Sequence, residues 1–285
     1  MGFKETYESW LSDDRLSAEA KAELENIKDN KEDIEYRFGA ELEFGTAGMR
    51  GIIGYGTNMM NVYTVKRATQ GLAEFIKTKG AEAMKRGVAI SYDTRLKSDE
   101  FATAAAEVLA ANGVNAFKFD DVHPVPMLSY AVRKLNAFAG IMVTASHNPK
   151  QYNGYKVYGE DGAQMSPDDT AVVVDFIKNI TDYLGTPAPT EEQAKKHIRA
   201  VPSKVDKKYY KELQKLTISK KAIKACGKDL KLVYTPVHGS GYVPVTTILK
   251  KIGITAEVVP EQIKKDTEFS TVEVPTPEFK ETLSR

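Results

Sequence analysis

Cysteine is almost absent from this chain of 285 residues, which contains one, Cys226. A single thiol excludes an intramolecular disulfide, and a buried or surface thiol is expected here in preference to a nucleophile. Long apolar runs are also missing, and the first five residues include the charged Lys4 and Glu5 and form no apolar core. The sequence therefore predicts neither a secretory signal nor a membrane span, and the cytoplasm is the expected location.

An excess of charge of one sign is missing as well. Lys and Arg number 40 against 39 Asp and Glu, a formal net charge of +1 at pH 7. No overall field attracts nucleic acid or an anionic membrane, so neither is an expected partner. With 42% hydrophobic and 28% charged residues, the composition is that of a globular protein with a buried core. The length favours about two domains.

Apolar strands alternate with amphipathic helices, and this alternation predicts an α/β layered fold. Strands are expected at 87–93, 114–119 and 140–145, and a helix with Ser98 as its N-cap follows the first of them. Residues 1–40 read as a polar helical lead-in on the surface, and 185–203 as a connection between domains. Two further strands are expected at 230–234 and 255–259.

Reactive side chains concentrate in Thr-Ala-Ser-His-Asn-Pro at 144–149. Pro149 ends the preceding strand, and Asn153-Gly154 predicts a second turn before a returning strand. Ser146 is therefore expected on a loop at the mouth of a sheet, with Lys156 brought back towards it. A hydroxyl beside an imidazole and an ammonium group suits phosphoryl chemistry, because cations stabilise phosphate charge. The alternative is a polar turn whose side chains satisfy backbone groups.

A second candidate for anion binding is the glycine-rich segment 44–51, which contains Arg50. Its amides can bind an anion, and the guanidinium group offers two parallel donors to a phosphate. The alternative is a glycine-rich bend with a solvated arginine, and the spacing of a Walker loop is absent. Asp93 and Arg95 follow a predicted strand, where they suit either a ligand crevice or an ion pair with each other.

Four segments resemble the phosphohexomutase superfamily, specifically bacterial phosphoglucomutase/phosphomannomutase, and they occur in the family's order: 44–51, 91–95, 144–156 and 234–241. Thr-Ala-Ser-His-Asn-Pro is highly specific to that family. The resemblance implies a first domain at 1–200, a three-layer mixed sheet between helices that carries a phosphoserine loop. It implies a second domain of the same type at 201–285, truncated.

The resemblance also implies that Ser146 is the phosphoserine. It exchanges phosphate with a hexose phosphate, and a bisphosphorylated sugar links hexose 1-phosphate with hexose 6-phosphate. Glucose 1,6-bisphosphate is the implied activator and intermediate, and the implied cofactor of the full-length enzyme is Mg²⁺, with phosphorylated Ser146 as a ligand. The implied catalytic residues are Ser146, His147, Arg50 and Lys156, and the implied substrate-binding residues are Thr46, Arg50, Asn148 and Lys156. An imidazole suits proton transfer near neutral pH.

Three motifs of that family do not occur between residues 1 and 285: the Asp-x-Asp-x-Asp metal loop, the Gly-Glu-Glu-Ser-Gly sugar loop and the Arg-x-Ser-Gly-Thr-Glu-Pro phosphate loop. We therefore expect the N-terminal part of a phosphohexomutase that does not complete the reaction alone. A non-catalytic module that binds a phosphosugar or anion is the alternative, and a serine hydrolase is disfavoured because Gly-x-Ser-x-Gly is absent. The sequence leaves open glucose or mannose specificity and the oligomeric state.

Overall fold

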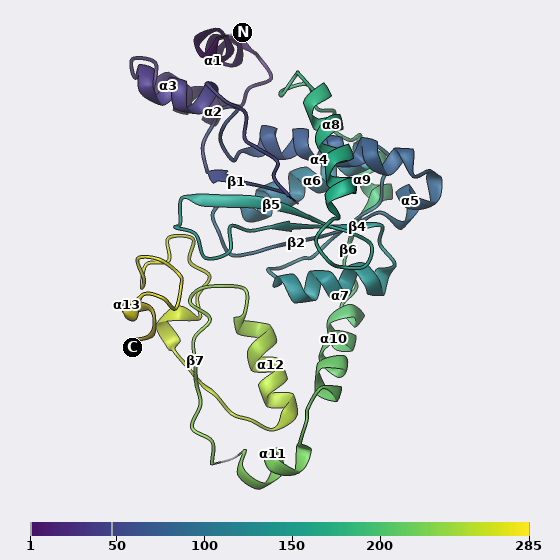
Figure 1. Ribbon diagram of the computed structural model, residues 1–285, viewed down its shortest axis with the longest axis vertical. Coiled ribbons are helices and arrows are strands. Elements are labelled where there is room, and N and C mark those ends of the chain that lie inside the picture. Colours follow the sequence, from purple (N-terminus) through teal and green to yellow (C-terminus); the bar gives the residue numbers. More distant parts are fainter. Residues whose placement is uncertain (1, 47, 228, 285) are drawn as a thin grey trace.

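The computed structural model describes residues 2–46, 48–227 and 229–284 (Figure 1). Ala47, which belongs to the predicted glycine-rich segment, lies outside the described residues, as does Arg285 at the end of the predicted second domain. Within the described residues no helix has the length and apolar character needed to cross a lipid bilayer.

A six-stranded mixed sheet forms the centre of the molecule, in the order β1-β5-β4-β2-β3-β6. β2 runs parallel to β3 and β4, and β3 parallel to β6, whereas β5 is antiparallel to both β1 and β4. β2 and β4 are buried along their whole length, because helices cover both faces of the sheet. The strands are β1 (Gly48–Ile52), β2 (Val88–Tyr92), β3 (Ala116–Lys118), β4 (Ala139–Val143), β5 (Tyr152–Tyr158) and β6 (Ile198–Ala200).

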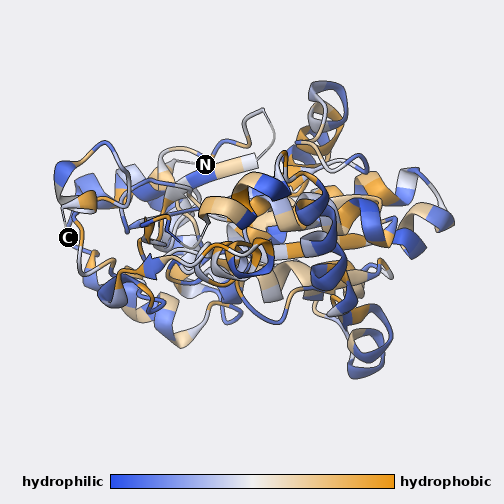
Figure 2. Ribbon diagram, turned by 90° about the horizontal axis from the view of Figure 1, so that it is seen from below, coloured by the Kyte–Doolittle hydropathy of each residue, from blue (hydrophilic) through white to orange (hydrophobic). Residues whose placement is uncertain are grey.

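Helices enclose this sheet on two sides, so the predicted α/β fold with a mixed sheet between helices is confirmed (Figure 1). On one side α4 packs against α6 and α8, and on the other α7 packs against β2 and β4. Figure 2 shows hydrophobic residues along the central strands and the neighbouring helices. The helices around the sheet are α4 (Val62–Thr78), α5 (Ala81–Arg86), α6 (Ser98–Ala111), α7 (Val125–Leu135), α8 (Pro167–Asn179) and α9 (Glu191–His197).

The first 40 residues form three short helices with a core of their own, so the expectation of a surface lead-in is wrong. They are α1 (Phe3–Ser12), α2 (Ala18–Asn26) and α3 (Lys31–Phe38), at the top of Figure 1. Trp10 is the centre of this core, with edge-to-face contacts to Phe38 at 5.5 Å and to Tyr63 of α4 at 5.6 Å. The apolar residues are divided among three short helices, so no single helical period reveals the buried face.

The expectation that 185–203 merely connects two domains is also wrong. This segment contains α9 and then β6, which pairs in parallel with β3 at the edge of the central sheet. α9 is rich in charged residues and has none that is buried, and β6 is an edge strand with little burial. The polar residues of 185–203 therefore reflect an exposed helix and an exposed sheet edge, and not a linker.

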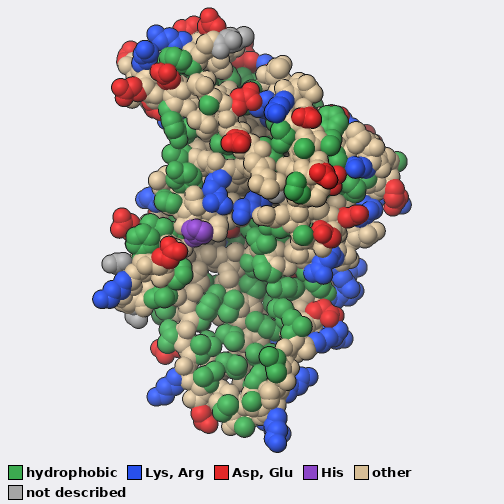
Figure 3. Space-filling view, viewed as in Figure 1, with side chains coloured by type: hydrophobic (Ala, Val, Ile, Leu, Met, Phe, Trp, Pro, Cys, Tyr) green, Lys and Arg blue, Asp and Glu red, His purple; other side chains and the backbone are tan. Residues whose placement is uncertain are grey.

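The last 80 residues extend below the sheet in Figure 1. The two strands expected there exist but are shorter than predicted, because β7 (Val233–Tyr234) and β8 (Glu257–Val258) form a parallel pair of only two residues each. Figure 3 shows hydrophobic side chains gathered over this lower part, with Lys and Arg side chains and a histidine above them. The remaining elements are α10 (Lys204–Lys215), α11 (Lys220–Cys226), α12 (Tyr242–Ile252), the 3-10 helix η1 (Pro260–Gln262) and α13 (Lys280–Leu283).

Candidate active site

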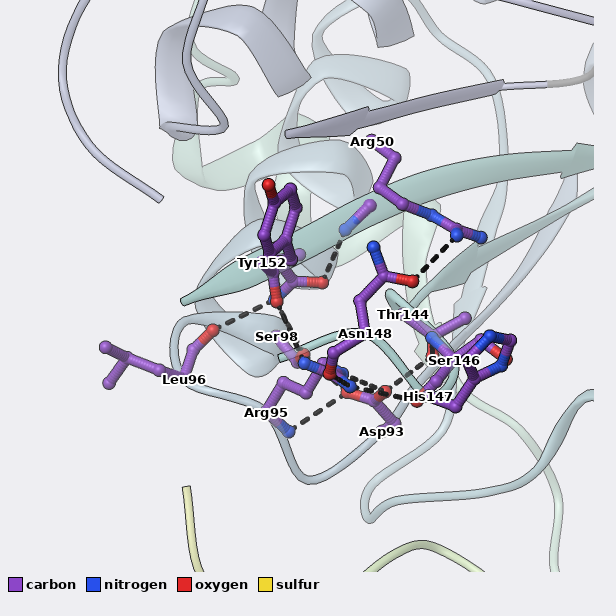
Figure 4. A network of polar contacts seen from close by, with 12 residues as sticks. Arg50, Asp93, Arg95, Leu96, Ser98, Thr144, Ser146, His147, Asn148 and Tyr152 are labelled. Atoms are coloured by element: carbon purple, nitrogen blue, oxygen red, sulfur yellow. Dashed lines mark hydrogen bonds and ion pairs between the residues drawn. The ribbon is translucent and has the colours of Figure 1, made fainter. Parts of the chain in front are cut away.

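Ser146 lies on the loop 144–151 between β4 and β5, hereafter the serine loop (Figure 4). It is exposed, and its backbone has a φ of 59°, a left-handed conformation that residues with a Cβ rarely adopt. The Ser146 amide donates a hydrogen bond of 2.9 Å to Thr144 Oγ1, and the Asn148 amide donates one to the Ala145 carbonyl at 3.2 Å. The loop therefore turns sharply and presents the serine hydroxyl to solvent.

Arg95 fixes the serine loop from below. Its guanidinium group, 1% exposed, donates hydrogen bonds to four backbone carbonyls of the region. Nη2 reaches the carbonyls of Ser146 (2.9 Å) and Asn148 (2.5 Å), and Nη1 those of Pro149 (2.9 Å) and Tyr152 (3.1 Å). A planar, permanently charged fork is suited to gathering several carbonyls at once. Arg95 therefore holds the backbone of the serine loop and is shielded from solvent.

Asp93 lies beside Arg95 and completes this support. Thr144 Oγ1 donates to Asp93 Oδ2 at 2.5 Å, while Ser98 Oγ donates to Oδ1 at 2.8 Å. Burial raises the pKa of the Asp93 carboxyl above its ordinary value, and these hydrogen bonds oppose that shift. Arg95 Nε is 3.6 Å from Asp93 Oδ2, so the two residues form an ion pair. Both also line the cleft described below.

The predicted N-cap of the helix after Asp93 is therefore wrong. Lys97, in a left-handed conformation, precedes α6, and Ser98 is its first helical residue. The Ser98 hydroxyl donates to Asp93 and accepts a hydrogen bond from Asn153 Nδ2 at 3.0 Å. The Ser98 hydroxyl therefore hydrogen-bonds to a buried carboxylate and does not cap the free amides at the start of the helix.

Arg50 stands on β1, so the glycine-rich segment is a strand at this point and not a bend. β1 pairs with β5 from Gly48 opposite Lys156 to Arg50 opposite Gly154. Glycine is needed at 48, where φ is 154° and an added Cβ would lie 2.1 Å from the Tyr155 carbonyl oxygen. Arg50 Nη1 donates to Asn148 Oδ1 at 2.9 Å, so an exposed guanidinium group reaches over the serine loop (Figure 4).

The predicted turn at Asn153-Gly154 is wrong, because both residues lie inside β5. A Cβ on Gly154 would lie 2.7 Å from the Thr144 carbonyl oxygen and 3.0 Å from that of Met49. The absence of a side chain lets β4, β5 and β1 approach closely. This close pairing brings Arg50 and Lys156 to the same part of the sheet.

Lys156, on β5, is half-buried and lines the same cleft as Ser146 and His147. Burial lowers the pKa of the Lys156 ammonium group, and the neighbouring Arg50 lowers it further. Two cations held near each other favour a bound anion. The expected approach of Lys156 to Ser146 therefore agrees with their common place on one cleft.

That cleft has a volume of about 480 Å³ and runs between the central sheet and the lower part of the chain. The sheet side contributes Ser146, His147 and Lys156 together with Asp93 and Arg95. Of the other wall, the sequence singled out only 234–241, as one of the four segments that resemble the family. This wall comes from the loop before α12 and from the C-terminal segment: Pro236, Val237, Gly239, Ser240, Phe269 and Pro275.

Thr46, Arg50 and Asn148 were predicted to bind substrate but are not among the described residues that line the cleft. Arg50 and Asn148 are hydrogen-bonded to each other at the serine loop, whereas Thr46 lies on an exposed turn just before β1. Ser146 and His147, in contrast, are in direct contact, with the serine Oγ 3.2 Å from His147 Nδ1. The hydroxyl therefore has a proton acceptor within reach, and Lys156 and Arg95 line the same cleft.

Mg²⁺ prefers an octahedral set of oxygen ligands, and the residues present do not supply one. In the part of the chain that the structure describes, no group of three or more His, Cys, Asp or Glu side chains is arranged to hold a metal ion. Asp93 is the only carboxylate among the described residues of the cleft wall, and both its oxygens accept hydrogen bonds. We therefore assign no chemical step to a metal.

Two family models match the chain in succession. Residues 41–184 match the model described as phosphoglucomutase/phosphomannomutase, alpha/beta/alpha domain I, and residues 207–285 match domain II of the same family. The chain therefore belongs to the phosphoglucomutase/phosphomannomutase family, and the resemblance stated from four segments is confirmed.

The curated relatives are longer than this chain. A phosphoglucomutase of Staphylococcus epidermidis is 41% identical over 242 residues, which are 83% of this chain and 42% of the relative. A phosphoglucomutase of Staphylococcus aureus is 38% identical over 260 residues, with coverage of 90% and 45%. The chain thus spans a little less than half the length of these relatives.

Solved structures of the family have the same fold. A candidate phosphomannomutase of Thermus thermophilus superposes with a TM-score of 0.66 at 25% identity, over 86% of this chain and 51% of that chain. The comparison therefore supports the α/β fold with a mixed sheet between helices.

Proposed function

We propose that this chain is the part of a phosphohexomutase that carries the phosphoserine, with hexose 1-phosphate and hexose 6-phosphate as substrates of the whole enzyme. One observation carries the proposal: an exposed serine on a left-handed turn lines a cleft together with Lys156, and Arg50 donates to Asn148 of the same loop. A passive polar turn does not require a strained, exposed serine beside a histidine in a cleft that is also lined by a lysine.

The phosphoryl transfer that this arrangement favours is a displacement at phosphorus. Ser146 Oγ attacks one phosphate of a hexose bisphosphate, a new O–P bond forms, and the bond from phosphorus to the sugar oxygen breaks. His147 Nδ1, 3.2 Å from Oγ, accepts the serine proton, which is then delivered to the departing sugar oxygen. Arg50 and Lys156 balance the charge on the transferring phosphate. The reverse transfer returns phosphate to a sugar hydroxyl.

Mg²⁺ and glucose 1,6-bisphosphate enter this proposal from the family resemblance alone. A divalent cation would neutralise phosphate charge next to Ser146, but the described residues lack the carboxylates to hold one. Hexose phosphate, as the small-molecule partner, fits a cleft of about 480 Å³ with cations at one end. Location in the cytoplasm stays a prediction from the sequence.

We also propose a division of the chain near residue 200, with domain 1 at 1–200 and domain 2 at 201–285. Support comes from β6 at Ile198–Ala200, which is hydrogen-bonded into the central sheet, and from α10, which begins a few residues later at Lys204. The second domain then contributes one wall of the cleft.

A single-turnover experiment tests the proposed function. The chain is mixed with an equal amount of glucose 1,6-bisphosphate, and both protein mass and released sugar phosphate are measured. We expect one phosphoryl group on the protein and a matching amount of glucose monophosphate. Binding of the bisphosphate without any transfer would instead support the non-catalytic phosphosugar-binding module.

Replacement of Lys156 by methionine should weaken the binding of inorganic phosphate about tenfold, because a charge-assisted hydrogen bond is lost. Calorimetric titration measures this affinity, with Lys178→Met, at an exposed position of α8, as the control.

Phosphate affinity of the wild type should fall as rising pH deprotonates Lys156. Because burial and Arg50 lower the pKa of Lys156, this fall should come at a lower pH than an ordinary lysine would give. Arg50→Gln should move that fall to higher pH, and an unchanged profile would contradict the assignment.

A further inference from the structure

Phe269 belongs to the C-terminal segment 264–271, which follows η1 and reaches the serine loop from the other wall of the cleft. Its side chain is 4% exposed, and its ring centroid lies 5.2 Å from the guanidinium carbon of Arg95. Its φ of 49° is left-handed, which is rare for a bulky residue. The ring is thus held against a buried cation by a backbone conformation that it would not adopt freely.

A set of short-range hydrogen bonds holds segment 264–271 in this shape. Asp266 accepts from the amides of Glu268 (2.9 Å) and Ser270 (3.0 Å), and the Phe269 amide donates to the Asp266 carbonyl at 3.2 Å. The hydrogen bond from the Ser270 hydroxyl is the main cause that lowers the pKa of Asp266 to about 2, so this carboxylate is ionised at neutral pH. His238 closes the turn from behind, with Nδ1 2.9 Å from the Lys264 carbonyl oxygen.

Two kinds of contact join this segment to the sheet, and they differ in strength. Lys150 of the serine loop pairs with Glu268 at 2.7 Å, but both side chains are more than half exposed. Exposed pairs contribute little to stability because water and salt screen them. The contact of Phe269 with Arg95 is buried, and cation–π attraction grows when the cation is desolvated.

We propose that Phe269 is a positioning residue that acts through Arg95. The ring covers the guanidinium group whose other donors hold the carbonyls of Ser146, Asn148, Pro149 and Tyr152. Removal of the ring lets water reach Arg95 and compete for those carbonyls, so the serine loop loses its fixed shape. The readiness of Ser146 for phosphoryl transfer therefore depends on a segment about 120 residues away in sequence. The transfer part of this inference rests on the proposed function.

Phe269→Met tests the inference, because methionine keeps volume and apolar character but removes the aromatic face. Amide hydrogen exchange of the full chain, followed by peptide mass, should show about tenfold faster exchange in the serine loop, the scale of one desolvated cation–π contact. Phe269→Tyr retains the ring and should restore slow exchange. Phe279→Leu, at a half-exposed aromatic of the same region, is the matched control and should leave the loop unchanged.

The second readout is the rate of Ser146 phosphorylation by glucose 1,6-bisphosphate. Phe269→Met should lower the maximal rate about tenfold and leave the half-saturating concentration within about twofold, because the loop and not the cation pair is disturbed. Exchange that rises in 264–271 but not in the serine loop would overturn the inference. An equal rise in α12 would also overturn it, since that pattern means general loosening. If Phe269→Met exchanges faster in the serine loop but the wild-type chain accepts no phosphate, the positioning role is retained and the proposed function is rejected.

Discussion

Replacing Ser146 by alanine is expected to abolish phosphorylation of the protein by glucose 1,6-bisphosphate. The hydroxyl is the nucleophile, and no other hydroxyl among the described residues that line the cleft is hydrogen-bonded to a histidine. Loss of a nucleophile removes the covalent path entirely, so the protein mass should stay at that of the unmodified chain. The measurement is intact protein mass after a single turnover.

The control for this experiment is Ser203→Ala, at an exposed serine that makes no side-chain cap to α10. It should accept phosphate as the wild type does. The alanine variant at 146 should remain folded, with a free energy of unfolding within about 0.5 kcal/mol of the wild type, because an exposed side chain is removed. Full phosphorylation of that variant would contradict the assignment of the nucleophile.

Replacing Arg95 by methionine should have the second largest effect, on stability and on phosphorylation together. Four carbonyls lose their donor and Asp93 loses its neighbouring cation in a buried place. Unpaired buried polar groups and an uncompensated buried carboxylate predict a loss of about 3–5 kcal/mol in the free energy of unfolding. Urea unfolding measures this loss.

Arg95→Lys separates charge from shape, because an ammonium group retains the charge but cannot reach four carbonyls in a fixed plane. We expect it to restore part of the stability and little of the phosphorylation rate. Arg199→Met, at an exposed arginine of β6, should change the free energy of unfolding by less than about 0.5 kcal/mol. A stable, fully phosphorylated Arg95→Met protein would show that the loop needs no clamp.

The position of Ser146 could be predicted from sequence because the signals are local. A run of apolar β-formers followed by Asn-Pro places the serine on a loop at the end of a strand, and the structure has it there. The role of Arg95 could not be derived in the same way. Its partners lie about 50 residues further along the chain, and only the parallel pairing of β2 with β4 brings them together.

Glycine caused the clearest local errors. At 48 and 154 it allows close approach of three strands, yet in sequence the same residue next to polar neighbours indicates a turn. Ser98 was misread for a related reason, since a serine before acidic residues matches an N-cap whether or not a buried carboxylate competes for its hydroxyl. Such competition is a tertiary property.

The far wall of the cleft shows a different limit. Phe269 has no periodic or motif signal, and its importance arises from its contact with Arg95, which is distant in sequence. The short β7 and β8 reflect the same dependence, because strands lengthen when neighbours and a covering layer bury them, whereas Leu230 and Val233 are 49% and 65% exposed. Sequence pattern sets which segments favour strands, and packing decides how far they extend.

The central claim is that the hydroxyl at position 146 receives phosphate from a sugar bisphosphate in a cleft lined by Lys156 and Arg95. Peptide fragmentation by mass spectrometry, after the wild-type chain is mixed with glucose 1,6-bisphosphate, tests it most directly. We predict a single phosphoryl group on Ser146 and none on the Ser146→Ala variant. Phosphate on another residue, or none on the wild type while the bisphosphate is bound, would contradict the account.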